Sequence, residues 1–249
     1  MKLQALAFVS VALAAAVARS GTDGNGEFGG DITVWPDNAG LFLFVDTQSR
    51  IEGGAVEKPI AELAADFNID IRRIAGAPGE VDVRKIPAEL KGYGAKGGIW
   101  IVDDPALPVS LAAIEDGWGV LNVAPILSDE PAAAVLALRV KKYINRLFAD
   151  LHGIGDPVMM PACVMKPAVG MKGVDALVCS TFSPESTGKI ISALASAGYK
   201  QRKFGTYYDA CEEGWAPAPT NAVQKAIWDK VHQLPTKPIK IQPPDARRK

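Results

Sequence analysis

The stretch RVKKYINRLFADLHGIGDPVMMPACVM, residues 139–165, decides how the rest of the chain is interpreted. Asp129 and Pro131, upstream of it, are start signals for a helix, and Gly153 is a stop signal. Apolar residues recur on one face of the predicted helix: Val135, Leu138, Val140, Tyr143, Ile144, Leu147, Phe148 and Leu151. The pattern predicts a long amphipathic helix over 129–153, followed by a loop-rich segment over 154–175.

The segments on either side of this helix indicate the fold class. Apolar runs and strand alternation predict strands at 41–45, 69–74, 97–104 and 118–127. Helical spacing predicts helices at 57–68, 184–198 and 221–232. Residues 105–117 are expected to be irregular or briefly helical. The order β-α-β-β-β-α, then coil and helices, predicts an α+β fold whose C-terminal part is loop-rich and helical.

The two ends of the chain differ in composition from its centre. Residues 1–18 combine Lys2, a short Ala-rich apolar run and a small-residue cleavage site, which predicts a secretory signal. A flexible leader is expected over 19–35, a single domain over 36–233, and a tail rich in Pro and Lys over 234–249. The mature protein is therefore expected to be secreted or periplasmic.

Charge and cysteine content narrow the possible partners. The chain has 27 Lys and Arg against 28 Asp and Glu, so no affinity for nucleic acid or for a membrane surface is expected after signal cleavage. Three cysteines are present, and an oxidising compartment makes one disulfide plausible. The preferred pair is Cys163 with Cys179, which leaves Cys211 as a free thiol.

Several short sequence patterns typical of catalytic or cofactor sites occur in the chain but do not predict such a site. GYGAKG, residues 92–97, fits a dinucleotide-binding pattern but precedes a strand, whereas that site must follow one. Asp103 and Asp104 would point to opposite faces of a strand, so they cannot flank one glycosidic bond. The two histidines, His152 and His232, have no serine nucleophile motif beside them.

The opening stretch resembles the zinc helix of archaemetzincin-type metalloproteases. That family has the pattern R-V-x-K-E-A-x-H-E-L-G-H-x-x-G-L-x-H, followed by Cys and then a C-V-M turn. The matching positions in this chain are Arg139, Val140, Lys142, Gly153, Ile154 and Cys163-Val164-Met165. The resemblance covers roughly residues 40–185 and implies a metzincin-like mixed β-sheet packed on helices, with Met165 beneath the metal position.

The residues that would do the chemistry are all different. By this resemblance Arg146 takes the place of the first His, Leu147 of the general-base Glu, Asp150 of the second His and Asp156 of the third. A structural Cys₄ zinc site is also incomplete, because only Cys163 and Cys179 match it while Pro157 and Phe182 replace the other ligands.

Zinc peptidase chemistry requires neutral nitrogen ligands, an open coordination position and a carboxylate base. The resemblance therefore implies no catalytic residue, no zinc and no other cofactor. Arg146 is instead hypothesised to pair with Asp150 and Asp156, so that its charge replaces that of the metal.

The sequence thus predicts an exported, inactive metallopeptidase-like protein that keeps its cleft for a peptide or protein ligand, or serves as a scaffold. Residues 118–124 would supply the edge-strand contacts to that ligand. Two alternatives stay open. One is an active zinc peptidase with ligands among Asp150, His152, Asp156 and His232, and with Glu115 as base. The other is a small-molecule-binding α/β domain unrelated to peptidases.

Overall fold

The computed structural model describes residues 26–47, 49–51, 53–77, 81–155 and 163–233. The chain divides into two compact units, one formed by Trp35–Arg202 and the other by the residues on either side of it. This division corrects the expectation of a single domain over 36–233. The predicted signal at 1–18 and the predicted tail at 234–249 lie outside the described residues.

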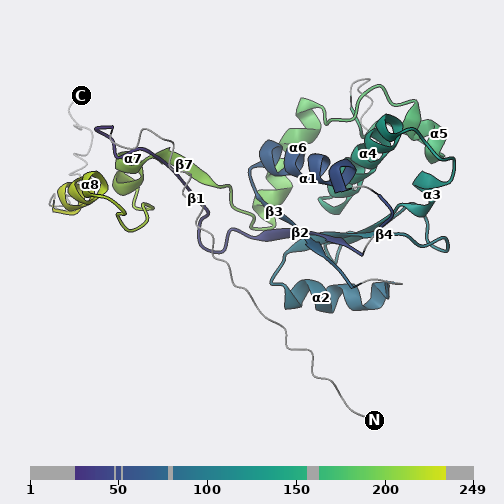
Figure 1. Ribbon diagram of the computed structural model, residues 1–249, viewed down its shortest axis with the longest axis horizontal. Helices are drawn as coiled ribbons and strands as arrows, with labels where there is room; N and C mark the ends of the chain where they lie inside the picture. The colour runs from purple at the N-terminus through teal and green to yellow at the C-terminus, as the bar shows by residue number, and fades with distance from the viewer. Residues whose placement is uncertain (1–25, 48, 52, 78–80, 156–162, 234–249) are drawn as a thin grey trace, which may run out of the picture. The chain divides into compact units, whose positions relative to one another are not determined.

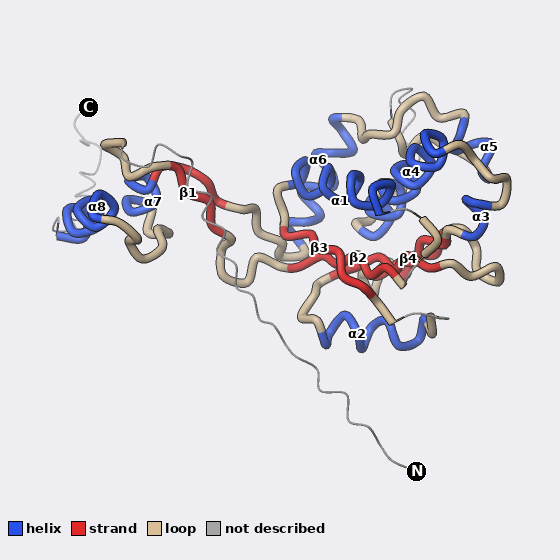
Figure 2. Tube along the Cα trace, viewed as in Figure 1, coloured by secondary structure: helices blue, strands red, loops and turns tan. Residues whose placement is uncertain are grey.

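The larger unit is built on a five-stranded sheet of order β3-β2-β4-β6-β5, whose strands are drawn in red in Figure 2. The strands are β2 (Leu41–Asp46), β3 (Asp70–Ala75), β4 (Gly97–Val102), β5 (Ser110–Ala113) and β6 (Trp118–Asn122). The first four in spatial order run parallel, and β5 runs antiparallel to β6 at one edge. The sheet is therefore mixed, as the resemblance implied.

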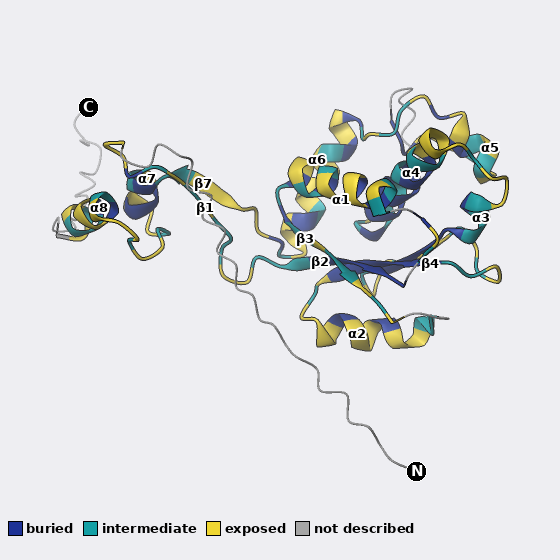
Figure 3. Cartoon of the chain, in the orientation of Figure 1, coloured by how far each residue is buried: buried dark blue, intermediate teal, exposed yellow. Residues whose placement is uncertain are grey.

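Helices cover both faces of this sheet. α1 (Gly53–Phe67), α4 (Ala133–Leu151) and α6 (Pro184–Ser196) lie on one side, and α2 (Ile86–Gly92) lies on the other (Figure 1). Alternate residues of the central strands feed two separate cores. Phe44 and Ile99 pack toward α4, whereas Val45 and Trp100 pack toward α2. This is why β2 and β4 are continuous apolar runs and are buried between the helix layers in Figure 3.

Short elements connect the layers. They are the 3₁₀ turn η1 (Val83–Lys85), α3 (Ala124–Leu127) and α5 (Gly170–Asp175). α4 begins at Ala133 rather than at Asp129, because the Asp129 carboxylate accepts hydrogen bonds from Arg139 instead of capping the helix. α1 begins at Gly53, a few residues before its predicted start.

Two sequence predictions about the sheet edge are wrong. Residues 105–117 contain β5, a regular strand, where irregular or helical structure was expected. Residues 118–124 were expected to form the edge, but β6 is buried between β4 and β5, and Ala124 begins α3. The reason is β5 itself, which pairs along β6 from Ser110 to Ala113 and takes the outer place.

The smaller unit contains β1 (Asp31–Val34), β7 (Lys203–Thr206), α7 (Tyr207–Glu212) and α8 (Ala222–Gln233). β1 pairs antiparallel with β7, so residues 31–34 are a strand rather than part of a flexible leader. Tyr207, Cys211 and Ile227 form its small core. In the described part of the chain, no helix has the length and apolar character needed to cross a membrane.

Candidate functional site

α4 carries the residues singled out from the sequence, and its surface has two stripes with different surroundings. Arg139, Lys142 and Asn145 form one, which we call the clamp stripe; their side chains donate hydrogen bonds to the chain between Asp129 and Ser180. Tyr143, Leu147 and Asp150 form the other, the cavity stripe, which lines a cavity beside β5. Both sets follow helical spacing, so each occupies one side of the helix.

Arg139 is the centre of the clamp stripe. Its side chain is 6% exposed and pairs with Asp129 (Nη1 to Oδ1, 2.6 Å) and with Asp175 (Nη2 to Oδ2, 2.7 Å). A further hydrogen bond reaches the carbonyl of Ile126 at 3.2 Å. The hydrogen bonds from Arg139 lower the pKa of both Asp129 and Asp175, so the carboxylates stay charged and hold α3 and α5 against α4.

Lys142 and Asn145 continue the clamp. The buried Lys142 ammonium donates to the carbonyls of Val174 (2.9 Å) and Leu177 (2.8 Å) at the end of α5, and burial lowers its pKa. Asn145 donates to the Ser180 carbonyl at 2.7 Å. Cations at a helix C-terminus satisfy carbonyls that have no partner within the helix. The sequence analysis matched Arg139 and Lys142 to the family pattern but did not predict this clamping role. The sequence indicates it by placing charged residues on a helix face whose other residues are mainly apolar.

Arg146 lies between the two stripes and holds the turn around Met165. Its Nη1 donates to the carbonyls of Val164 (2.7 Å) and Lys166 (2.9 Å), and Met165 is buried between them. The hypothesis that Arg146 pairs with Asp150 is therefore corrected: within the described residues its hydrogen bonds go to backbone oxygens. Asp156, the third proposed member of that cluster, lies outside the described residues.

Leu147 occupies the position that the resemblance assigns to the general base. It is 2% exposed and packs on Gly119 of β6, where an added Cβ would lie 3.0 Å from Leu147 Cδ1. Gly119 thus allows the close approach of helix and sheet. A hydrocarbon in this place cannot accept a proton from water.

The cavity beside the cavity stripe has a volume of about 190 Å³. Its lining residues are Val109, Ser110, Tyr143, Arg146, Leu147, Asp150, Ala168, Gly170 and Val174. Asp150 is half-buried; burial raises the pKa of its carboxyl, and the nearby Arg146 charge opposes that rise. Burial likewise raises the pKa of Tyr143. The cavity therefore places polar groups of α4 next to the edge strand.

β5 presents an open backbone edge at this cavity. The Asn122 N–H donates to the Val109 carbonyl at 2.9 Å, which fixes the phase of the antiparallel ladder with β6. Because the pairing alternates, the N–H and C=O groups of Ser110 and Ala112 point away from β6, toward the outer edge. The strand SLAA carries no charge that would block another strand.

Asn122 fixes the approach to this edge, and sequence reasoning missed it. Its buried side chain donates to the carbonyls of Asp104 (2.6 Å) and Leu107 (2.7 Å) and accepts from the Asp104 N–H at 3.0 Å. These bonds hold the loop that leads into β5. A buried Asn at the end of an apolar strand was the available signal.

Known structures share this arrangement of sheet and helices. The chain is similar to the archaemetzincin of Methanopyrus kandleri, with a TM-score of 0.52 and 17% identity over 65% of this chain and 99% of that one. The fold is metallopeptidase-like. A zinc-dependent peptidase from Methanocorpusculum labreanum (strain Z) aligns with a TM-score of 0.47 and 14% identity, over 61% of this chain and 100% of that one. No protein-family model and no curated protein matches the chain.

The residues of α4 do not fit the zinc ion that such a fold implies. In the described ranges, no three His, Cys, Asp or Glu side chains come together in a group that could hold a metal. His152 Nδ1 lies 2.7 Å from the Phe148 carbonyl, with its ring 4.5 Å from that of Phe148, and His232 stacks on Trp228 in the smaller unit. Glu115 is exposed in the turn after β5. Among the described residues that line the cavity, Asp150 is the one carboxylate, and Arg146 places a positive charge beside it.

The predicted disulfide between Cys163 and Cys179 is not formed, since all three cysteines, which lie in the described part of the chain, are free thiols. Cys163 Sγ accepts from the Ser183 N–H at 3.4 Å and lies 3.5 Å from Ser186 Oγ. Burial acts to raise the pKa of this thiol, but the hydrogen bonds around it outweigh burial and lower it. Cys163 is thus a core residue held by α6.

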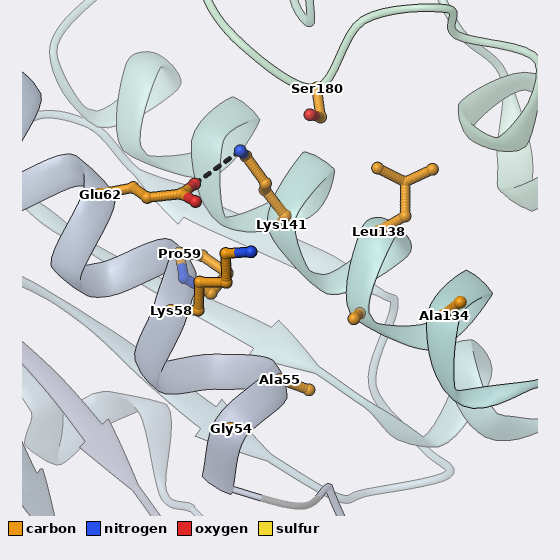
Figure 4. Close-up of a pocket in the computed structure, with 10 residues that line it drawn as sticks. Gly54, Ala55, Lys58, Pro59, Glu62, Ala134, Leu138, Lys141 and Ser180 are labelled. Atoms are coloured by element: carbon orange, nitrogen blue, oxygen red, sulfur yellow. Dashed lines mark ion pairs between the residues drawn. The ribbon is translucent and has the colours of Figure 1, made fainter.

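A second cavity, of about 280 Å³, lies between α1 and α4 (Figure 4). Figure 4 shows Lys58 extending from α1 into this space and Lys141 reaching toward Glu62. The Lys141 ammonium pairs with the Glu62 carboxylate at 2.5 Å, so its charge is already neutralised. The remaining walls are mainly small and aliphatic. The cavity beside β5 is the stronger candidate site because it combines polar groups with an open strand edge.

Proposed function

We propose that this protein is a catalytically inactive member of the metallopeptidase-like fold that binds an extended peptide along β5. The observation that carries the proposal is Leu147, a buried hydrocarbon packed on Gly119, at the position that the resemblance assigns to the proton-accepting base. Arg146 and Asp150 add to it, since a cation and a single carboxylate do not form a zinc site.

The edge of the sheet supports peptide binding in particular. An extended peptide can pair with the outward N–H and C=O groups of Ser110 and Ala112, in the way that strands are added to open sheet edges. The cavity lies directly beside Ser110 and can take a side chain of the added strand. Backbone pairing would supply affinity, and the cavity would supply specificity.

Export is part of the proposal and rests on residues 1–18. A secreted or periplasmic protein should lose this segment on processing. The mass of the protein recovered from the extracytoplasmic fraction should correspond to a chain that begins after Ala18. An unprocessed chain in the cytoplasm would contradict export without affecting peptide binding.

Metal content and hydrolysis test the inactive state. Protein purified without chelators should contain far less than one zinc per chain by elemental analysis, and should leave a mixed fluorogenic peptide library intact with or without added zinc. One zinc per chain, together with cleavage that a chelator abolishes, would sink this half of the proposal and revive the active-peptidase alternative.

Peptide pairing is tested by removing one outward N–H from β5. Peptides selected by display on the wild-type protein should bind Ala112→Pro at least about tenfold more weakly, because proline has no N–H to donate and is tolerated on an edge strand. Ala112→Val is the matched control, since it keeps the N–H and the strand preference. Equal binding by all three proteins would mean that the peptides do not use this edge.

A further inference from the structure

The cavity beside β5 is lined by polar side chains that have no hydrogen-bond partner among the described residues. Tyr143 is 6% exposed and lines the cavity, yet across the described residues its hydroxyl makes no hydrogen bond. A hydroxyl that is open to a cavity and makes no hydrogen bond within the protein can donate one to a ligand that enters the cavity. Asp150 lines the same cavity, and its carboxylate likewise has no hydrogen-bond donor among the side chains and backbone that the structure describes.

Arg146 adds donors to the same cavity. Its Nη1 is used by the carbonyls of Val164 and Lys166, which fixes the guanidinium in place. The planar group has five N–H donors, so Nε and Nη2 can still serve a ligand. The Arg146 charge acts on the ionisation of both Tyr143 and Asp150, which places it close to each.

The combined charge of the cavity decides which side chain fits. Arg146 contributes one positive charge and Asp150 one negative charge. An ammonium or guanidinium would pair with Asp150 but would also lie beside Arg146, and a carboxylate would pair with Arg146 but would also lie beside Asp150. Either would therefore bring a like charge into the cavity, which an uncharged side chain avoids. A hydrocarbon would seal the cavity while leaving Tyr143 and Asp150 without partners.

A primary amide matches all of these groups without adding charge. Its oxygen accepts hydrogen bonds, which Tyr143 and Arg146 can donate, and its NH₂ group donates, which the Asp150 carboxylate can accept. A cavity of about 190 Å³ is smaller than the sites that hold drug-sized ligands, and suits one side chain.

We propose that this cavity is a subsite for the amide side chain of Gln or Asn in the peptide bound along β5. The inference rests on the proposed function for the peptide backbone, but the cavity itself makes the selection. Tyr143, Arg146 and Asp150 would determine specificity, with Ser110 marking where the cavity meets the strand edge.

Small capped amino acids test the subsite without the strand edge. N-acetyl-glutamine methylamide should shift the NMR signals of the Tyr143 ring in a saturable manner. The glutamate, lysine and norleucine analogues should bind at least about tenfold more weakly. Tyr143→Phe and Asp150→Asn should each remove most of the preference for glutamine, and Asp116→Asn, an exposed acid in the turn after β5, should leave it unchanged.

Peptides then separate the two proposals. A positional library should be enriched in Gln or Asn at one position, and Asp150→Asn should abolish the enrichment while peptides still bind. Binding that Ala112→Pro weakens but that shows no amide preference overturns the subsite alone. Glutamine binding to the cavity, with no peptide bound at β5, overturns the proposed function alone. Stronger binding of the lysine or norleucine analogue also refutes the amide assignment.

Discussion

The two stripes of α4 use polar groups in opposite ways. On the clamp stripe, Arg139 and Lys142 are buried. Arg139 forms ion pairs with two carboxylates, and Lys142 donates hydrogen bonds to carbonyls at the end of α5. On the cavity stripe, Tyr143 and Asp150 face a cavity, and their polar groups have no hydrogen-bond partner in the described chain. One helix therefore stabilises the fold with one side and places polar groups at a cavity on the other.

This contrast gives the resemblance to zinc peptidases a physical meaning. The positions that match the family pattern, Arg139 and Lys142, carry out structural work that does not depend on metal. The positions that differ, Leu147 and Asp150, line the cavity, and the resemblance assigns them to the general base and to a metal ligand. Under the proposed function, the contacts that maintain the fold persist while the residues needed for zinc chemistry are replaced.

Leu147→Glu is the substitution that would break the contrast most severely, because it places a carboxylate on the cavity stripe at a packed position. It should lower the free energy of unfolding by about 4 kcal/mol, since it removes a buried hydrocarbon and buries an acid beside Gly119. Urea denaturation measures the loss, with Leu147→Met as the control of similar volume. The variant should still not cleave peptides when zinc is added. Zinc-dependent cleavage would mean that only the base was missing.

Arg139→Met should cost about 3 kcal/mol, because it removes both ion pairs of the clamp stripe. The partial exposure of Asp129 and Asp175 keeps the cost at the low end for a buried pair. Lys58→Met, on an exposed part of α1, is the control and should change stability by less than about 0.5 kcal/mol.

The same variant has a defined pH dependence. Arg139 lowers the pKa of Asp129 and Asp175 in the folded state, so their contribution is present above the ordinary Asp pKa and is lost as the pH falls through the lowered values. The difference between wild type and Arg139→Met should therefore shrink below about pH 4. A difference that stays constant from pH 7 to pH 2 would show that packing, and not charge, accounts for the loss.

Much of the sheet and of the helices could be predicted from the sequence, because those elements depend on local pattern. β2 and β4 are apolar runs that no solvent-exposed segment would carry, and α6 begins at Pro184 as its Ser183 cap indicates. β5 was missed because SLAA has neither a strand pattern nor strong β-formers. Its structure comes from pairing with β6, which is a tertiary effect.

The site was less accessible from the sequence. The positions Arg146, Leu147 and Asp150 could be chosen by alignment, but the partner of Arg146 depends on where the turn around Met165 comes to lie. Their spacing on the helix predicted that Arg146 would pair with Asp150. In the structure, Arg146 donates its hydrogen bonds to two backbone carbonyls instead. The disulfide prediction failed for a similar reason, because it depended on packing that the sequence does not show. Cys163 is a free thiol enclosed by Ser183 and Ser186, and Cys179 is also free.

Asp150→Asn should change the free energy of unfolding least of these variants, and it should increase stability where the others decrease it. Burial raises the pKa of Asp150 in the folded state, so its ionised form is less favourable there than in the unfolded chain. Stability is therefore lost as the pH rises from the ordinary Asp pKa, about 3.9, through the raised value. The amide has no charge to bury, so the variant should be more stable than wild type at pH 7, by on the order of 0.5 kcal/mol, and equal to it below about pH 4.

Opposite signs for Asp150→Asn and Arg139→Met in one set of thermal melts between pH 3 and pH 7 would separate the two stripes in a single experiment. N-acetyl-glutamine methylamide sharpens the test, because it should stabilise wild type at pH 7 and should stabilise Asp150→Asn much less. If Asp150→Asn instead lowers stability at pH 7, the carboxylate has a donor that holds it charged, and the cavity stripe is a second clamp. Both stripes of α4 would then stabilise the fold through paired charges, and the basis for amide recognition at the cavity would be lost.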